Sequence, residues 1–233
     1  MRIAIMQPYF LPYIGYFQLI KAVDQFVIYD NIEFTKKGWI NRNRILVDKK
    51  ADYFTIPLKK DSDFLKVNQR FLSDSFSSEK IKILGRISHL YKKAPEFDLI
   101  YPMVAHVFNN SETNLFYFIL NALREINTYL EIQTKITISS EIVIDHSLKS
   151  ENKVIAICKA LSATEYYNSI GGLELYSQST FQENQLNLHF IKPNPIVYQQ
   201  FQDEFIPWLS ILDVLFFNSK EKVQEFLSQY TIL

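Results

Sequence analysis

Four cations lie close together in the segment KKGWINRNR. Lys36, Lys37, Arg42 and Arg44 fall within nine residues, and Trp39 lies between them. An arginine binds a phosphate through two parallel hydrogen bonds, and a lysine supplies a point charge. The ring of Trp39 offers a surface on which a base or a sugar can stack. The segment therefore indicates a phosphate-bearing ligand, such as a nucleotide or a sugar nucleotide.

Two other interpretations of these cations stay open. A run of charge is often only a solvated loop, and cations interleaved with aromatic residues also suit the stacking of RNA bases. The formal net charge is zero, so no overall charge attracts the chain to nucleic acid, and RNA binding is the weakest of the three interpretations. In a sugar-nucleotide site, Asn41 and Asn43 of the same segment would orient sugar hydroxyls.

The segment QPYFLPYIGY, residues 7–16, follows the apolar run RIAIM. Ligands of open parallel sheets bind beyond the carboxyl ends of the strands, where we expect this loop to lie. Its spacing before a helix is similar to the His-x-Gly-His turn of nucleotidylyltransferase-like folds, with tyrosines in place of the histidines. Gln7, Tyr13 and Tyr16 are therefore candidate ligand contacts. The alternative is a stiff, proline-rich turn packed with aromatic side chains.

A third motif is EYYNSIGGLELY, residues 165–176. We expect a strand to end near Tyr167 and Asn168, and a helix carrying Tyr176 to begin after Gly171 and Gly172. Backbone N–H groups at a helix N-terminus suit an anion or a sugar hydroxyl. Alternatively, the glycines only supply positive φ for the turn. The chain has just 5 glycines, and this favours the functional interpretation.

Two groups are candidates for accepting a proton. Asp30 ends the apolar run QFVIYD, and His89 lies near the end of a helical pattern. A carboxylate or an imidazole is the ordinary general base. The histidines show no ligand spacing, so we expect no metal site. Asp213 lies in the apolar segment LSILDVLFF, where a buried carboxylate must be hydrogen-bonded; it is either structural or a second candidate base.

The framework that these motifs need is predicted by the alternation of strands and helices. Short apolar, β-branched runs predict strands over 2–6, 25–30, 134–139, 164–169 and 186–191, and helical patterns lie between them. Residues 76–130 carry helical periodicity alone, and we expect a closing helical segment from Trp208 to the C-terminus. The sequence thus predicts an α/β fold with an open, mainly parallel sheet, flanking helices and a mostly helical insertion around 76–130. We expect one domain over 1–233; two lobes with the site between them are the alternative.

Composition is that of a soluble globular protein, with 48% hydrophobic and 21% charged residues. We expect a cytoplasmic protein, because the sequence shows no leader, no membrane span and a single cysteine. Aromatic residues make up 15% of the chain, which leaves room for an apolar interface in a homo-oligomer.

As a whole, the chain resembles the WbqC-like proteins, which are encoded among bacterial O-antigen and capsular polysaccharide genes. The resemblance runs nearly end to end. It rests on the motifs MQPYFLPYIGYFQLI, VDQFVIYDNIEF and KKGWINRNRI, with support from YKKAPEF, YYNSIGG and LSILDVL.

This resemblance implies an enzyme that transfers an acyl or aminoacyl group, such as glycyl, to the amino group of a nucleotide-linked amino deoxysugar. The alternative is a non-catalytic accessory protein that binds nucleotide sugars or glycans. The acyl or aminoacyl donor is open. ATP is a candidate cofactor, because it could activate a carboxylate as an acyl-adenylate before the amine attacks.

Overall fold

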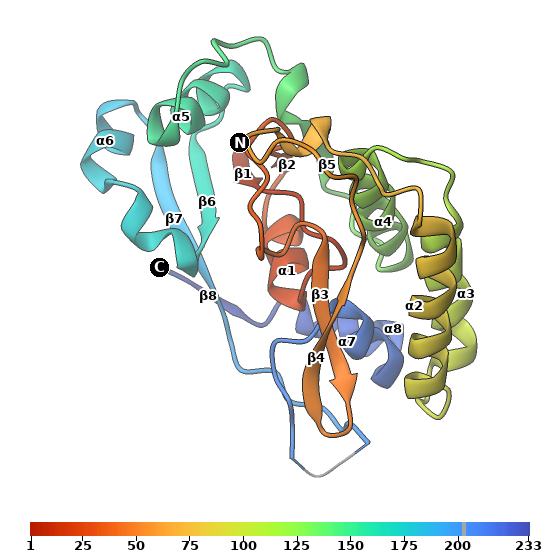
Figure 1. Ribbon diagram of the computed structural model, residues 1–233. Coiled ribbons are helices and arrows are strands. Elements are labelled where there is room, and N and C mark those ends of the chain that lie inside the picture. Colours follow the sequence, from red (N-terminus) through yellow and green to blue (C-terminus); the bar gives the residue numbers. More distant parts are fainter. Residues whose placement is uncertain (202–203) are drawn as a thin grey trace.

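The computed structural model describes residues 1–201 and 204–233. Its main sheet contains the parallel strands β1, β2, β5, β6 and β7 and an antiparallel edge strand, β8 (Figure 1). Their bounds are Arg2–Met6, Gln25–Ile28, Lys135–Ile138, Glu165–Ser169, Asn187–Pro193 and Tyr230–Ile232. The predicted α/β class and the mainly parallel sheet are confirmed.

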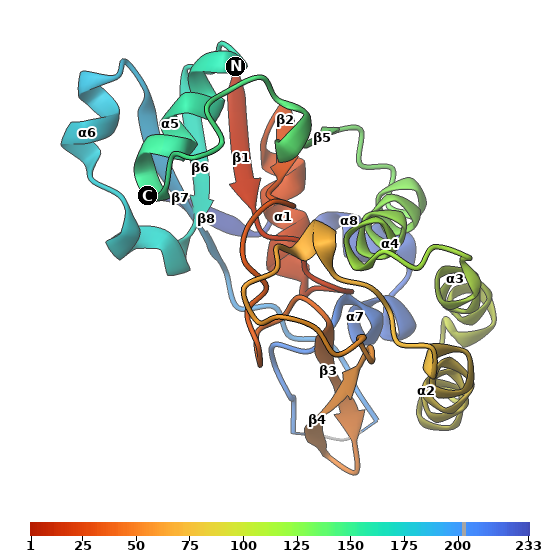
Figure 2. The same ribbon diagram turned by 45° about the horizontal axis from the view of Figure 1, so that its top comes forward.

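The strand order β5-β2-β1-β6-β7-β8 defines where a ligand can bind. The chain passes from β1 to β2 on one side, and it later returns to the other side of β1 as β6. The loops that leave β1 and β6 therefore diverge and open a crevice at the carboxyl ends of these two strands, which lie side by side in Figure 2. Crevices of this kind hold the ligands of open α/β sheets.

Side chains alternate across this sheet into two apolar clusters. Ala4 and Phe26 face the cluster that holds α1, while Ile3, Ile5 and Val27 face the cluster that holds α5. Helices thus cover both faces, which is why the strands read as continuous apolar runs in the sequence. On the first face lie α1 (Ile14–Ala22), α7 (Ile211–Phe217) and α8 (Lys220–Phe226), and on the second lie α5 (Ser150–Ala160) and α6 (Gln178–Glu183).

The helical segment predicted around 76–130 consists of α2 (Phe76–Tyr91), α3 (Phe97–Asn109) and α4 (Leu115–Tyr129). These helices lie to one side of the sheet (Figure 2). Their apolar faces join the same buried cluster as α1, so no polar gap separates them from the sheet. The 3-10 turns η1 (Val67–Gln69) and η2 (Ser139–Glu141) lie in the connections before α2 and after β5.

The basic segment 36–44 is only partly a loop, because a hairpin begins at Arg42. Strands β3 (Arg42–Val47) and β4 (Lys50–Thr55) pair antiparallel and form a separate two-stranded sheet. Asp48 and Lys49 have φ of 45° and 66°, as a tight hairpin turn with a right-handed twist requires. The sequence concealed this hairpin because the turn contains no glycine and because a polar residue, Asn43, occupies an inward position of β3.

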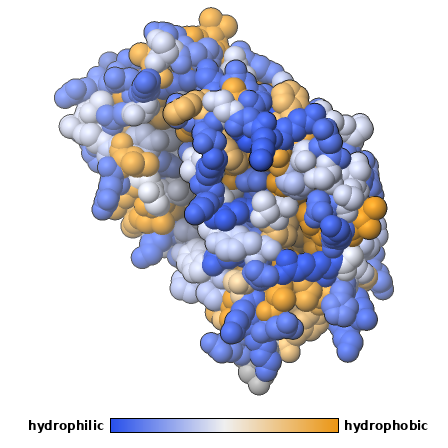
Figure 3. All heavy atoms as spheres, viewed as in Figure 1, coloured by the Kyte–Doolittle hydropathy of each residue, from blue (hydrophilic) through white to orange (hydrophobic). Residues whose placement is uncertain are grey.

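Two further elements differ from expectation. Residues 173–184 do not form one helix: the 3-10 helix η3 (Ile170–Leu175) precedes the short α6. The chain also does not end in a helix, because β8 follows α8 and pairs with β7. The face seen in Figure 3 is mostly hydrophilic, with hydrophobic residues in scattered groups.

Candidate functional site

The loop between β1 and α1 is held in place by the hairpin. Asn43 Nδ2 donates to the backbone oxygens of Phe10 and Leu11 at 3.2 and 2.9 Å, and Phe10 N donates to Ile40 O at 3.2 Å. Ser210 Oγ donates to Leu11 O from the other side, at 2.7 Å. Segments near residues 10, 40 and 210 are thereby fixed together at the carboxyl edge of β1.

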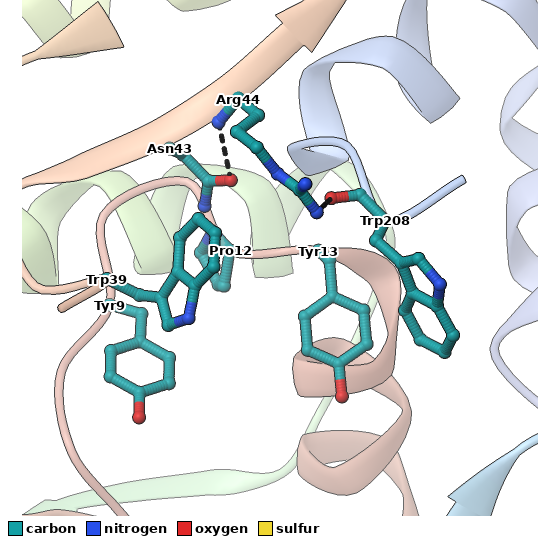
Figure 4. Close-up of a pocket in the computed structure, with 7 residues that line it drawn as sticks. All are labelled: Tyr9, Pro12, Tyr13, Trp39, Asn43, Arg44 and Trp208. Carbon is teal, nitrogen blue, oxygen red and sulfur yellow. Dashed lines mark hydrogen bonds between the residues drawn. The ribbon is translucent and has the colours of Figure 1, made fainter. Parts of the chain in front are cut away.

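A hollow of about 270 Å³ lies where these segments meet, and we call it the aromatic hollow (Figure 4). The rings of Tyr9 and Trp39 lie on one side and those of Tyr13 and Trp208 on the other. Tyr13 and Trp208 meet edge to face, with ring centroids 5.7 Å apart. The hollow is lined by Tyr9, Pro12, Tyr13, Trp39, Asn43, Arg44 and Trp208.

Arg44 supplies the positive charge of the aromatic hollow. Its Nη2 donates to Trp208 O at 2.9 Å, and its guanidinium carbon lies 5.3 Å from the centroid of the Trp39 ring. Its Nε is buried and has no hydrogen-bond partner among the described residues, and no carboxylate of that part of the chain forms an ion pair with Arg44. An arginine that lines a hollow beside aromatic rings, with no carboxylate to neutralise it, is suited to bind an anionic, ring-containing ligand.

The two tyrosines of the hollow remain neutral phenols around neutral pH. Burial raises the pKa of Tyr9 and Tyr13, and the proximity of the two phenols raises that of Tyr13 further. Each can therefore donate a hydrogen bond to a ligand oxygen, but neither supplies a phenolate base at neutral pH.

A second hollow, of about 680 Å³, adjoins the first, and we call it the aliphatic hollow. Tyr13 and Trp208 line both hollows. Ile170, directly after β6, lines the aliphatic hollow, so the crevice between β1 and β6 opens here. Its remaining walls come from α1, from the end of β7 and the segment 194–198 that follows it, from 205 and 207–209, from α7 and from the residues around β8.

The structure brings four of the predicted ligand contacts into the aromatic hollow: Tyr13, Trp39, Asn43 and Arg44. Tyr16 and Gln7 are placed differently. Tyr16 is buried in the core and its hydroxyl donates to Gln7 O at 2.9 Å, so this pair fixes the start of the loop.

The other residues of the basic segment mostly contact protein. Arg42 Nε donates to Gly38 O at 3.1 Å and its guanidinium lies over Tyr53, while Arg42 Nη2 donates to Lys37 O. Asn41 Nδ2 donates to Ile56 O at 2.8 Å, and Lys36 pairs with Asp63. Lys37 itself is exposed. Of the cations in this segment, only Arg44 lines the aromatic hollow.

The motif at 165–176 lies beside the aliphatic hollow, which it enters only through Ile170. Tyr167 stacks on His189, with centroids 4.7 Å apart, and Asn168 is buried. No described glycine has positive φ. Instead, a Cβ on Gly172 would lie 2.3 Å from Asn168 Nδ2, so the lack of a side chain at Gly172 allows Asn168 to approach its backbone. A Cβ on Gly171 would meet only Ser169 Oγ, at an ordinary contact distance of 3.9 Å.

Tyr176, at the end of this motif, packs away from both hollows. Its hydroxyl lies 3.5 Å from that of the buried Tyr166, and its ring meets Phe181 of α6 edge to face. Burial raises the pKa of Tyr176.

Asp30 lies at the carboxyl edge of β2, as predicted, but it is 1% exposed. One of its oxygens accepts from Ser140 N at 2.9 Å, and the other accepts from Ser140 Oγ and Asn68 Nδ2 at 2.6 and 2.7 Å. The carboxylate thereby joins the connections that contain η1 and η2. Next to it, Asn31 contacts His146 Nδ1 at 3.0 Å.

His89, on α2, lies in a separate hollow beside the tip of the β3–β4 hairpin, with Asp48, Lys49 and Phe201. Neither Asp30 nor His89 lines the aromatic or the aliphatic hollow. Both therefore remain predictions that the placement of the hollows does not support.

Trp208 and Tyr9 were missed in the sequence. Trp208 falls in a segment predicted to be helical, yet it precedes α7, and its φ of 61° lies in the left-handed region that large side chains rarely adopt. The signal that could have revealed it is Pro207 followed by a large aromatic residue, two positions before Ser210, which caps α7. Tyr9 was overlooked within a loop otherwise recognised as a binding edge.

Asp213 is a fully buried carboxylate beneath the aliphatic hollow. It accepts from Tyr91 Oη at 2.8 Å, from Tyr198 Oη at 2.6 Å and from Gln200 Nε2 at 2.7 Å. Burial raises its pKa, and the three hydrogen bonds oppose that shift only in part. With its oxygens occupied in this way, Asp213 holds Tyr198 and Gln200 in place.

The fold and the two hollows define an α/β protein with a candidate ligand site at the point where its strand order reverses. The chain belongs to the WbqC-like protein family, whose model matches residues 7–225. The uncharacterized protein Rv1507c of Mycobacterium tuberculosis (strain ATCC 25618 / H37Rv) is 29% identical to it over 217 residues, which cover 92% of this chain and 93% of that protein. No solved structure matches the chain at a significant level.

Residues 1–201 and 204–233 are the part of the chain that the structure describes. In this part of the chain, every helix is too short or too polar to cross a membrane. Nor do three or more histidine, cysteine, aspartate or glutamate side chains come together there in an arrangement that could hold a metal ion.

Proposed function

We propose that this protein modifies nucleotide-linked amino sugars in bacterial surface polysaccharide biosynthesis, by transferring an acyl or aminoacyl group to the sugar amine. Membership in the WbqC-like family supports the pathway. The observation that carries the proposal is the aromatic hollow, in which Arg44 lies beside two indoles and two phenols.

In this proposal each lining group has a role that its chemistry allows. Arg44 binds the diphosphate, because its guanidinium lines the aromatic hollow and pairs with no carboxylate among the described residues. Trp39 or Trp208 stacks on the base or the sugar, and the hydroxyls of Tyr9 and Tyr13 donate to sugar oxygens. Asn43 acts indirectly, because its amide nitrogen already donates to Phe10 O and Leu11 O.

The reaction replaces one bond to the acyl carbon by another. The amine nitrogen attacks the carbonyl carbon, an amide C–N bond forms, and the bond to the leaving group of the donor breaks. The nitrogen loses one proton, which ends on the leaving group or on solvent. If the donor is instead a free acid activated by ATP, the protein must catalyse exchange of labelled pyrophosphate into ATP in the presence of that acid.

Binding tests the proposal directly. We expect UDP-glucosamine or dTDP-linked amino deoxysugars to bind in calorimetry, and Arg44→Ala to weaken that binding by about tenfold to thirtyfold, since a charge-assisted hydrogen bond contributes about 1.5–2 kcal/mol. The matched control is Arg124→Ala on α4, an exposed arginine remote from both hollows. Equal affinities in the wild type and in Arg44→Ala would remove the aromatic hollow from the site.

A second candidate is a non-catalytic protein that binds nucleotide sugars for an assembly complex. It is favoured by one observation: among the described residues that line the two hollows there is no carboxylate, imidazole or thiol. The single cysteine, Cys158, lies on the buried face of α5, and burial raises the pKa of its thiol to about 12. Mass spectrometry decides between the two: an N-acylated sugar nucleotide supports the enzyme, and a ligand recovered unchanged with every donor supports the accessory protein.

A further inference from the structure

The aliphatic hollow has a chemistry unlike that of its neighbour. It is more than twice as large, at about 680 against 270 Å³, and its walls carry isoleucine, valine, leucine and proline side chains. Ile14, Ile170, Ile196 and Val214 all line it. Hydrophobic walls of this kind gain free energy by covering hydrocarbon rather than polar rings.

Several of the polar groups around the aliphatic hollow already have protein partners. The hydroxyl of Tyr198 points to Asp213, at 2.6 Å, so this residue offers mainly its ring. Thr231 Oγ1 donates to Asn194 Oδ1 at 2.9 Å. A nucleobase would find few free donors and acceptors here, and burying its polar edge without partners would cost free energy. A hydrocarbon chain meets no such cost.

Exposed apolar side chains surround the mouth of the aliphatic hollow. Val197, Trp208 and Leu233 line it and are 69%, 61% and 55% exposed. Lys192, also exposed, is the one charged side chain among the described residues that line it. A ligand with a chain inside and an anionic group outside would cover the former and contact the latter.

We propose that the aliphatic hollow binds the hydrocarbon chain of the acyl donor, so that the transferred group is an aliphatic acyl chain and not glycyl. This inference rests on the proposed function. Because Tyr13 and Trp208 line both hollows, their shared border is where the donor carbonyl meets the sugar amine. With a thioester donor, the amide C–N bond forms as the C–S bond breaks, and the amine proton leaves with the thiol.

Calorimetry of the full chain with acetyl-, octanoyl- and dodecanoyl-coenzyme A tests the inference. We expect the affinity to rise about fourfold for each added methylene until the hollow is filled, because each buried methylene contributes about 0.8 kcal/mol. Equal affinity for the acetyl and dodecanoyl thioesters would overturn the inference. Tighter binding of farnesyl diphosphate than of dodecanoyl-coenzyme A would also overturn it, by assigning the chain to a lipid carrier.

Variants place the chain in this hollow. Ile196→Glu puts a carboxylate among its apolar walls and should weaken dodecanoyl-coenzyme A binding by at least about tenfold. Ile81→Glu on α2 is the matched control, since Ile81 is 70% exposed and remote from the hollow. Val197→Glu is the second test should Ile196→Glu not fold, because Val197 is largely exposed. Unchanged affinity in the folded variants would overturn the inference.

The two proposals fail separately. Ile196→Glu should leave the affinity for UDP-glucosamine within about twofold, because Arg44 and Trp39 are untouched. If the wild type binds no sugar nucleotide, the proposed function fails, whatever the thioesters do. If sugar nucleotides bind and thioester affinity does not depend on chain length, only the inference about the donor fails.

Discussion

Asp30 and Arg44 are both charged residues that the sequence places near the ligand edge of the sheet, yet their surroundings differ. Asp30 is 1% exposed and accepts three hydrogen bonds from Ser140 and Asn68. Arg44 borders an open hollow, donates one side-chain hydrogen bond, to Trp208 O, and pairs with no carboxylate among the described residues. A charged group whose hydrogen-bonding capacity is filled by protein stabilises the fold, and one with capacity left over can bind a ligand.

The largest effect that we expect is on stability, at Asp30. Asp30→Ala leaves the donors of Ser140 and Asn68 buried without an acceptor and should lower the free energy of unfolding by about 3 kcal/mol. Asp30→Asn, which keeps the shape and one acceptor, should cost less. Urea denaturation measures both. If Asp30→Ala keeps wild-type stability and loses acyl transfer, Asp30 is a catalytic carboxylate and the distinction drawn here is wrong.

The second effect is a pH dependence that comes from Asp213. Burial raises its pKa above the ordinary 3.8, so between 3.8 and the raised value the folded state binds more protons than the unfolded state. The free energy of unfolding therefore falls as pH rises through this window, and it receives no such change below 3.8.

Asp213→Asn should remove this slope. It should also lower stability by about 1–2 kcal/mol, because the new amide cannot accept from all three present donors. Urea curves of the wild type and the variant, recorded at several pH values and subtracted from each other, isolate the contribution. A difference that is constant with pH would show that Asp213 titrates alike in both states.

A smaller effect concerns stacking in the aromatic hollow. Trp39→Ala should weaken sugar-nucleotide binding by about fivefold, because one aromatic contact contributes about 1 kcal/mol. Trp39 stacks on Tyr53 at 6.0 Å, on the side of the hairpin, so Tyr53→Ala is a control that disturbs the indole without removing it. A larger loss in Tyr53→Ala than in Trp39→Ala would assign the ligand to the hairpin surface.

The smallest effect is expected at His89. His89→Ala should change the affinity for sugar nucleotides by less than about twofold and the stability by less than about 0.5 kcal/mol, since surface substitutions outside a site are usually near neutral. Its hollow lies beside the hairpin tip, apart from the aromatic hollow. A loss of acyl transfer with unchanged binding would make His89 the general base and bring the two hollows into one reaction.

The sequence was sufficient for the framework. Strands that are buried on both faces appear as unbroken apolar runs, so β1, β2, β5, β6 and β7 could be located. Their parallel direction could be predicted from the helices between them. The hairpin could not be located in this way, because the turn at Asp48 and Lys49 adopts positive φ without glycine. Such a turn is imposed by strand pairing and has no local signal.

For the site, residue type identified candidates, but only tertiary structure could sort them. Arg42 and Arg44 lie on the same face of β3, yet the first is hydrogen-bonded to Gly38 O and the second lines the aromatic hollow. Tyr13 and Tyr16 are only three residues apart in the sequence, yet Tyr13 lines the hollow while Tyr16 is buried in the core. Trp208 joins them from a segment far along the chain, a distance across which local patterns carry no information.

Trp208 also links the two hollows to the least regular part of the chain. It lies between β7 and α7, a stretch without helices or strands among its described residues, and it is a wall of both hollows at once. A local opening of this stretch would empty both hollows while leaving the sheet intact. Occupied hollows should accordingly slow protease cleavage between residues 194 and 209, and a ligand for either one should protect the same peptide bonds.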